Sequence, residues 1–198
     1  MTNEQIEQNK ARFISLLSQV KRNGIDRLID WFEKYDFFTA PASTKYHLSE
    51  DGGLCQHTLN VYDRLKAKAD AGLVNLSDES VIITALCHDA CKARFYEKKQ
   101  LWRKGPDGKT WESYDSWVVN EVMPLGHGEK SCYIVQLFTW LSPEEYAMIR
   151  FHMGREGEGY NDYFTKAAGM YPGVVALHTA DLEAAFILEA DKGEEEGK

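Results

Sequence analysis

The sequence contains little cysteine, and its cysteines do not form a scaffold pattern. Four cysteines occur among 198 residues, and no two of them form a Cys-x-x-Cys pair. This density excludes a disulfide-rich secreted domain. Three of the four lie within apolar helical patterns, which predicts reduced and buried thiols in a cytoplasmic protein.

Long apolar runs and an excess of positive charge are also missing. No apolar run approaches the roughly 20 residues that a membrane-spanning helix needs, and the first residues lack the order of a signal peptide. We therefore expect no membrane partner. The net charge of -8 argues against broad nucleic-acid binding, which normally requires a basic face. A small phosphorylated substrate stays open, because bound metal ions supply local positive charge.

The composition is that of a packed globular chain, with 43% hydrophobic residues and no internal repeat. We expect one domain over 1–198, with a motif-bearing core at about 41–190, N-terminal helices in 1–40 packing on it, and an acidic flexible tail at 191–198. Helical periodicity and capping signals predict helices at 3–20, 25–32, 54–69, 78–92, 128–141, 143–153 and 172–190.

A different pattern occupies the stretch from about Tyr96 to Trp117. Two polar and aromatic segments flank Gly105-Pro106-Asp107-Gly108, which is typical of a β-hairpin. The expected fold class is therefore all-α with a small β-hairpin insertion. The hairpin aromatics serve either as a lid stacking on a nucleobase or as cross-strand packing. They are Tyr96, Trp102, Trp111 and Tyr114.

Six histidines are the most informative residues of the chain. Most of them, and two carboxylates, fall on the apolar faces of predicted helices. The ligand-type residues are His47, His57, His88, Asp89, His127, His152, His178 and Asp181. Burying an ionised carboxylate is expensive, and an unsatisfied imidazole costs something like 1–3 kcal/mol. One shared metal centre would compensate all of these groups, so the pattern predicts one.

The dipeptide His88-Asp89 is the centre of this pattern, because two side chains about 100° apart on a helix can flank one ion. Here the sequence resembles the HD-domain superfamily of metal-dependent phosphohydrolases, and within it the group common in phage and prophage genomes. That superfamily has a histidine, an HD dipeptide and a distant aspartate, matched by His57, His88-Asp89 and Asp181. The resemblance covers roughly Pro41 to Leu188, through the segments Gly52–Leu59, His88–Lys92, Gly126–Ser131, Ile149–Gly154 and Ala176–Asp181.

The resemblance implies an HD-domain helical bundle with one or two divalent ions, drawn from Mn, Fe, Co, Ni, Zn and Mg. The implied metal ligands are His57, His88, Asp89, His127, His152 and Asp181. With two ions, Asp89 bridges them, and His127 and His152 hold the second. With one ion, these two histidines contact the substrate phosphate instead.

The implied reaction is hydrolysis of a phosphomonoester or phosphodiester of a small molecule, with a nucleotide as the favoured substrate. A metal-activated hydroxide attacks phosphorus, and Asp89 and Lys92 are the expected catalytic residues. Lys92, one helical turn after the dipeptide, reaches the phosphate as a point charge. Further expected substrate contacts, each with an ordinary surface role as the alternative, are His47, Lys130 and Arg155. His178 is expected beside Asp181 without being a ligand.

Two other functions remain open at this stage. Some HD proteins, such as myo-inositol oxygenase, hold two irons with four histidines and two aspartates, and the same residue types are present here. A non-catalytic nucleotide-binding module is the third possibility.

Overall fold

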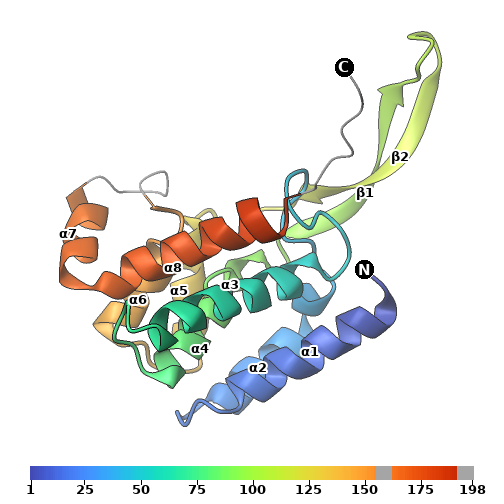
Figure 1. Ribbon diagram of the computed structural model, residues 1–198. Helices are drawn as coiled ribbons and strands as arrows, with labels where there is room; N and C mark the ends of the chain where they lie inside the picture. Colours follow the sequence, from blue (N-terminus) through green and yellow to red (C-terminus); the bar gives the residue numbers. More distant parts are fainter. Residues whose placement is uncertain (155–161, 191–198) are drawn as a thin grey trace.

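The computed structural model describes residues 1–154 and 162–190, which form a mostly helical structure with one two-stranded antiparallel sheet (Figure 1). This confirms the expected helical class with a hairpin. The expected contact residue Arg155 and the expected tail 191–198 lie outside the described residues. The helices are α1 (Asn3–Leu17), α2 (Ile25–Lys34), α3 (Gly53–Asp70), α4 (Asp78–Cys87), α5 (His127–Gln136), α6 (Pro143–Arg150), α7 (Asp162–Met170) and α8 (Pro172–Glu183).

The described ranges 1–154 and 162–190 also contain three short helical turns with defined bounds. Two are 3-10 turns, η1 (Asp36–Phe38) and η2 (Ala90–Lys92), and η4 (Ala184–Leu188) is a π-helical turn that continues α8. Within residues 1–154 and 162–190, none of the helices combines the length and the apolar character that crossing a bilayer requires.

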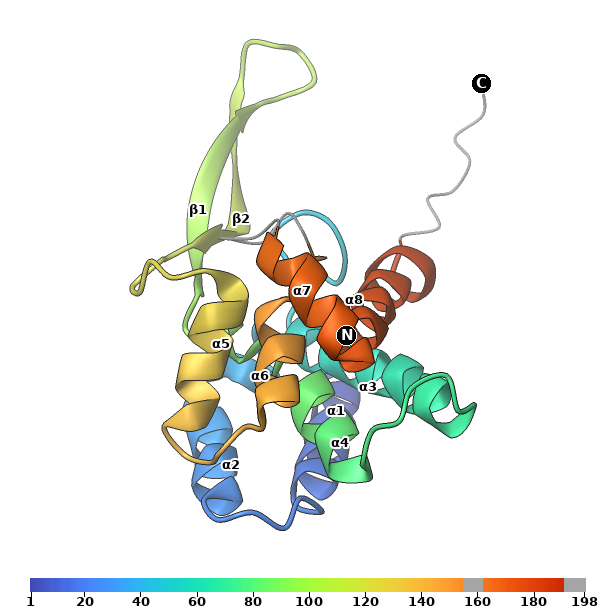
Figure 2. The same ribbon diagram turned by 90° about the vertical axis from the view of Figure 1, so that its left-hand side faces the viewer.

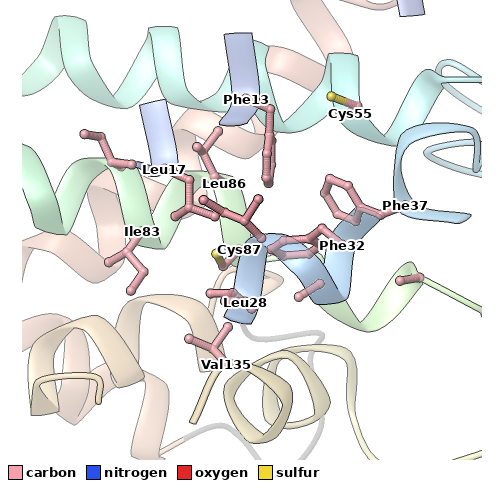
Figure 3. Packing of buried hydrophobic residues seen from close by; sticks show 14 of the residues in the cluster. Phe13, Leu17, Leu28, Phe32, Phe37, Cys55, Ile83, Leu86, Cys87 and Val135 are labelled. Carbon is pink, nitrogen blue, oxygen red and sulfur yellow. The ribbon is translucent and has the colours of Figure 1, made fainter. Parts of the chain in front are cut away.

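An aromatic cluster joins the first two helices to the rest of the molecule. Phe13 of α1 packs edge-on against Phe32 of α2 at 5.2 Å between ring centroids, and Phe32 packs against Phe37 at 4.4 Å. Figure 3 shows these rings beside Cys55 of α3 and Cys87 of α4, in one buried cluster. Each fully buried aromatic ring contributes on the order of 2–3 kcal/mol of hydrophobic stabilisation. This core holds α3, which carries His57, close to α4, which ends just before His88.

A second buried cluster holds α3, α4, α6 and α8 together. Its largest members come from all four helices and are fully buried; they include Leu65, Val81, Met148 and Leu177. Helix α8 lies along α3 in Figure 1, and α5 and α6 lie side by side in Figure 2. The ends of these helices therefore meet in one region.

Several helix bounds differ from the sequence-based expectation. The helix predicted over 78–92 ends at Cys87, because His88 caps it and Asp89 leaves helical geometry with φ -107° and ψ 22°. The helix predicted over 128–141 ends at Gln136. Helix α7 was not predicted. The capping box expected at the start of α6 is present, with the Ser142 hydroxyl accepting from the Glu145 N–H.

The predicted hairpin is confirmed and consists of β1 (Tyr96–Lys104) and β2 (Trp111–Val119), paired from Tyr96↔Val119 to Lys104↔Trp111. Figures 1 and 2 show that it projects from the helical body. At its base, the Tyr96 hydroxyl donates to the Ala42 carbonyl at 3.4 Å. Trp102 and Trp111 lie towards the tip and are each 61% exposed.

Candidate metal centre

Five side chains from four places in the chain meet between the ends of the helices. His57 comes from α3, His88 and Asp89 from the end of α4, His152 from the residues after α6, and Asp181 from α8. The three histidines and Asp89 are each at most 2% exposed. The local turns explain the placement, since the helix ends at Cys87 and at Arg150 release the following side chains towards the same point.

His88 and His152 are held in the same way. The Nδ1 of His88 lies 2.8 Å from the Ala85 carbonyl, and the Nδ1 of His152 lies 2.7 Å from the Ile149 carbonyl. A carbonyl only accepts, so each Nδ1 carries a hydrogen, and in the neutral ring each Nε2 presents a lone pair. Both Nε2 atoms are buried without a hydrogen-bond partner among the described residues. Two unsatisfied imidazole nitrogens in one place indicate a missing electron-pair acceptor.

Asp89 lies between these rings. Its Oδ2 is 3.4 Å from the Nε2 of His88, its Oδ1 is 3.5 Å from the Nε2 of His152, and Lys92 Nζ pairs with Oδ2 at 2.7 Å. Burial opposes ionisation of this carboxyl, but the charge of the Lys92 ammonium group holds its pKa well below its usual value. Asp89 is therefore an ionised ligand group at neutral pH.

His57 lies between two further carboxylates. Its Nε2 is 3.1 Å from Oδ1 of Asp181, and its Nδ1 is 2.9 Å from Oε2 of Glu189. Burial by itself would lower the pKa of His57, but the hydrogen bonds and charges of the two carboxylates raise it to about 10. Against the opposing effect of burial, hydrogen bonding to His57 lowers the pKa of both Asp181 and Glu189.

The geometry and the charge both fit a divalent cation. Ligand atoms about 2.1 Å from a common ion lie about 3.0–3.4 Å apart at tetrahedral or octahedral angles. The separations here are similar: 3.1 Å from His57 to Asp181, 3.4 Å from His88 to Asp89, and 3.5 Å from His152 to Asp89. Two groups share His88 and satisfy ligand spacing, one with His57 and Asp89 and one with His152 and Asp181.

Charge leads to the same conclusion. Among the described residues of the cluster, three carboxylates, Asp89, Asp181 and Glu189, accompany one ammonium group, that of Lys92. With His57 neutral, as a ligand must be, the excess of two negative charges matches one divalent cation. Imidazole nitrogen and carboxylate oxygen together suit Zn, Mn, Fe, Co or Ni.

The expected ligand His127 occupies a different position from the other five. It begins α5 and is partly buried, with its Nδ1 3.4 Å from Cys91 Sγ and its ring edge-on to Phe95 at 5.3 Å. It shares no ligand-spaced group with the other histidines in the part of the chain that the structure describes. Burial lowers the pKa of His127, so the ring is neutral.

The expected substrate contacts have distinct surroundings. Lys92 donates both to Asp89 and, at 2.8 Å, to the Ala42 carbonyl. Lys130 pairs with both oxygens of Glu121 at 2.7 Å and lies over the Phe95 ring. His47 lies against His57, at 4.9 Å between ring centroids. Of these residues, His47 and Lys92 adjoin the candidate ligands directly.

His178 contacts the backbone of His152, one of the candidate ligands. Its Nδ1 lies 2.6 Å from the carbonyl of His152, and its ring fills the space beside Gly154. A side chain at Gly154 would collide with this ring, since a Cβ there would be 2.6 Å from it. The expectation that His178 neighbours the ligands without being one agrees with this contact.

Sequence reasoning missed Glu189. It lies eight residues after Asp181, which on a continuous α-helix is about 80° away around the axis. The π-helical turn η4 takes fewer degrees per residue and so brings the two carboxylates closer to one face. Helical periodicity carries no signal for such a turn. The sequence offers only an acidic residue directly after the apolar run Ala184–Leu188.

The centre opens to solvent on one side. The Asp181 and Lys92 side chains are 14% exposed and His47 is 20% exposed, while His57, His88, Asp89, His152 and Glu189 are buried. Comparisons of the chain with family models, with curated proteins and with solved structures found no match.

Proposed function

We propose that the chain is a metal-dependent phosphohydrolase of the HD-domain type, acting on a phosphomonoester or phosphodiester of a small molecule, with a nucleotide as the favoured substrate. The observation that carries the proposal is the convergence of His57, His88, Asp89 and Asp181, in the order of the HD motif, with ligand-like spacing. The motif resemblance supplies the reaction class. The geometry supports the metal dependence.

The residues around the cation have separable tasks. A bound divalent ion polarises phosphoryl oxygens and lowers the pKa of a coordinated water. Asp89 and the imidazoles hold the ion, and the carbonyls of Ala85 and Ile149 fix two of the rings in the ligating tautomer. These contacts pre-organise the ligands before any substrate binds.

Lys92 is the cation best placed to contact a phosphate. An ammonium group has three N–H donors, and two of them are used on Asp89 and on the Ala42 carbonyl. The third is available for a phosphate oxygen at the solvent-open side. His47, with a buried Nε2 that has no hydrogen-bond partner among the described residues, lies on the same side. Both residues are proposed substrate contacts.

A small substrate is favoured over a polymer. The ligand atoms are buried, and only the edges of Asp181, Lys92 and His47 reach solvent. A net charge of -8 also disfavours long polyanions.

The decisive experiment is a metal analysis of the purified protein, followed by phosphate release from a nucleotide panel with each candidate metal. We expect stoichiometric metal and turnover that survives removal of oxygen. Asp89→Ala is expected to lose both the metal and the activity. Oxygen consumption with bound iron would replace the hydrolase by the oxygenase, and nucleotide binding without turnover would indicate a binding module. Retained metal in Asp89→Ala would refute the centre.

A further inference from the structure

Glu189 forms the outer side of the centre, behind His57. Its two carboxylate oxygens lie 2.9 and 3.1 Å from Nδ1 of His57, and the opposite nitrogen of that ring, Nε2, faces Asp181 at 3.1 Å. The ring is therefore held from both sides. Figure 1 shows the geometry at the level of the chain: the C-terminal end of α8 lies beside α3, the helix that carries His57.

A row of amide side chains extends from Glu189 to the first helix. Asn60 Nδ2 donates to Glu189 Oε1 at 2.8 Å, Gln56 Nε2 donates to Asn60 Oδ1 at 2.8 Å, and Asn9 Nδ2 donates to Gln56 Oε1 at 2.9 Å. Asn60 and Gln56 each donate towards the carboxylate and accept from the residue behind them. Glu189 thus accepts from Asn60, and its lowered pKa keeps the carboxyl ionised, so the hydrogen between Glu189 and His57 belongs to Nδ1.

The backbone before Glu189 adopts a rare conformation that places its carboxylate beside His57. The π-helical turn after α8 is a rare conformation, and the Glu189 N–H closes it by donating to the Ala184 carbonyl at 3.0 Å. Glu189 itself is 8% exposed, although it is a carboxylate near the end of the described chain. A buried acid delivered by a rare turn and met by two donors has the features of a positioned group rather than a surface one.

We propose that Glu189, braced by Asn60 and Gln56, is a positioning residue that keeps His57 in its Nδ1–H tautomer and so presents Nε2 to the cation. The inference rests on the metal centre of the proposed function. It assigns to Glu189 the role that the Ala85 and Ile149 carbonyls have for the other two imidazoles. A carboxylate in this role also raises the basicity of the ligating nitrogen.

A second cation bound by His47, His57 and Glu189 is the competing interpretation, because these residues also satisfy ligand spacing. A neutral imidazole has only one lone pair. His57 therefore cannot give Nδ1 to that ion while giving Nε2 to an ion beside Asp181. The stoichiometry of binding separates the two interpretations.

The test is titration of the ion-free full chain with Co²⁺, followed by visible absorption. Glu189→Gln replaces an acceptor-only group with one that turns a donor towards either His57 or Asn60, and we expect Co²⁺ affinity to fall by about 10- to 100-fold. We also expect a changed ligand-field spectrum at saturation, with one ion per chain in both proteins. Asn60→Ala is expected to change affinity in the same direction by a smaller factor.

Glu183→Gln is the matched control, since Glu183 ends α8 just before the π-helical turn and pairs with Lys68. It is expected to bind Co²⁺ as the unchanged protein does, and circular dichroism verifies that all variants are folded. Unchanged affinity and spectrum in folded Glu189→Gln would overturn the positioning role alone. Loss of one of two bound ions would assign Glu189 to a second cation instead. Absence of Co²⁺ binding by the unchanged protein would overturn this inference together with the metal centre.

Discussion

His57 Nε2 lies 3.1 Å from Oδ1 of Asp181, although these residues belong to α3 and α8, which are far apart in the sequence. Neither helix places its residue alone, because the separation depends on the apolar packing of α3 against α8, to which Leu65 and Leu177 contribute. The candidate centre is thus a product of the core, and a proton or a cation between the two side chains is linked to folding.

The first prediction concerns the pH dependence of cation binding. The two carboxylates raise the pKa of His57 to about 10 in the ion-free protein, so the ring is protonated at neutral pH. A cation has to displace that proton, and its affinity should therefore rise by about tenfold per pH unit between pH 6 and 9. Titration with Mn²⁺ or Co²⁺ across this range, with proton release followed by an indicator dye, measures both quantities.

The same shift predicts the stability of the ion-free protein. A group whose pKa is raised by folding stabilises the folded state fully below its unfolded pKa, near 6.5 for histidine. That contribution should decline as pH rises towards 10, and a saturating cation should abolish the decline. Denaturation curves with and without the ion test this. An affinity and a stability that are both independent of pH would show that His57 carries no displaceable proton.

The second prediction concerns the pair of Lys92 and Asp89, 2.7 Å apart. Lys92→Met leaves a buried carboxylate without its cation, so we expect the ion-free protein to lose about 3 kcal/mol of unfolding free energy. A divalent ion at the centre replaces the lost charge and should restore most of this loss. Thermal unfolding with and without Mn²⁺ measures the rescue.

Lys66→Met is the control for this variant. Lys66 pairs with Asp70 on the exposed side of α3, where solvent screens the interaction, so no measurable change is expected with or without the ion. Equal destabilisation of Lys92→Met in the presence and absence of the ion would mean that Lys92 is only a structural partner of Ala42 and Asp89.

The sequence predicts the helical class, the hairpin and the set of buried ligand-type residues, because these follow from periodicity and turn chemistry. It does not predict that α4 stops at Cys87, since the apolar pattern continues through Ala90 and Cys91. The tertiary contacts of the site decide that break. Likewise, the position of His127 against Cys91 depends on where α5 docks, which no local pattern encodes. Glu189 could not be predicted, because the assignment of residues to one helix face assumes α-helical spacing. A π-helical turn changes which residues share a face.

The third prediction concerns Glu145, a buried carboxylate outside the centre. It accepts two hydrogen bonds from Arg22, at 2.7 and 2.8 Å, and others from Ser80 and the Ser142 N–H. Burial opposes its ionisation, but these donors lower its pKa, so its contribution to stability is present above pH 4.5 or so and is lost as pH falls through the folded value. Glu145→Gln should cost about 3 kcal/mol at pH 7.

Urea denaturation at pH 7 and at pH 3 checks this sign. The difference between the unchanged protein and Glu145→Gln should be large at pH 7 and much smaller at pH 3. Glu144→Gln, in the same helical turn but not part of the Arg22 pair, should show little difference at either pH. If the difference in unfolding free energy between the two proteins stayed constant down to pH 3, the shape of the Glu145 side chain, and not its charge, would account for the destabilisation.

The fourth prediction concerns the packing of α5 against α6, which sets the position of His127 and the residues before His152. A Cβ at Gly128 would lie 2.1 Å from the Arg150 carbonyl oxygen, a backbone atom that cannot move aside alone. Gly128→Ala should therefore separate the two helices and destabilise the protein by about 2–4 kcal/mol.

The control is Gly169→Ala in α7. A Cβ at Gly169 meets nothing within 4 Å, so this variant should be neutral or stabilising by up to about 1 kcal/mol. Because Arg150 precedes His152, Gly128→Ala should also weaken Co²⁺ binding, and Gly169→Ala should not. Urea denaturation and Co²⁺ titration of the two variants measure both effects, and a stable Gly128→Ala with normal Co²⁺ affinity would refute the close approach of α5 and α6.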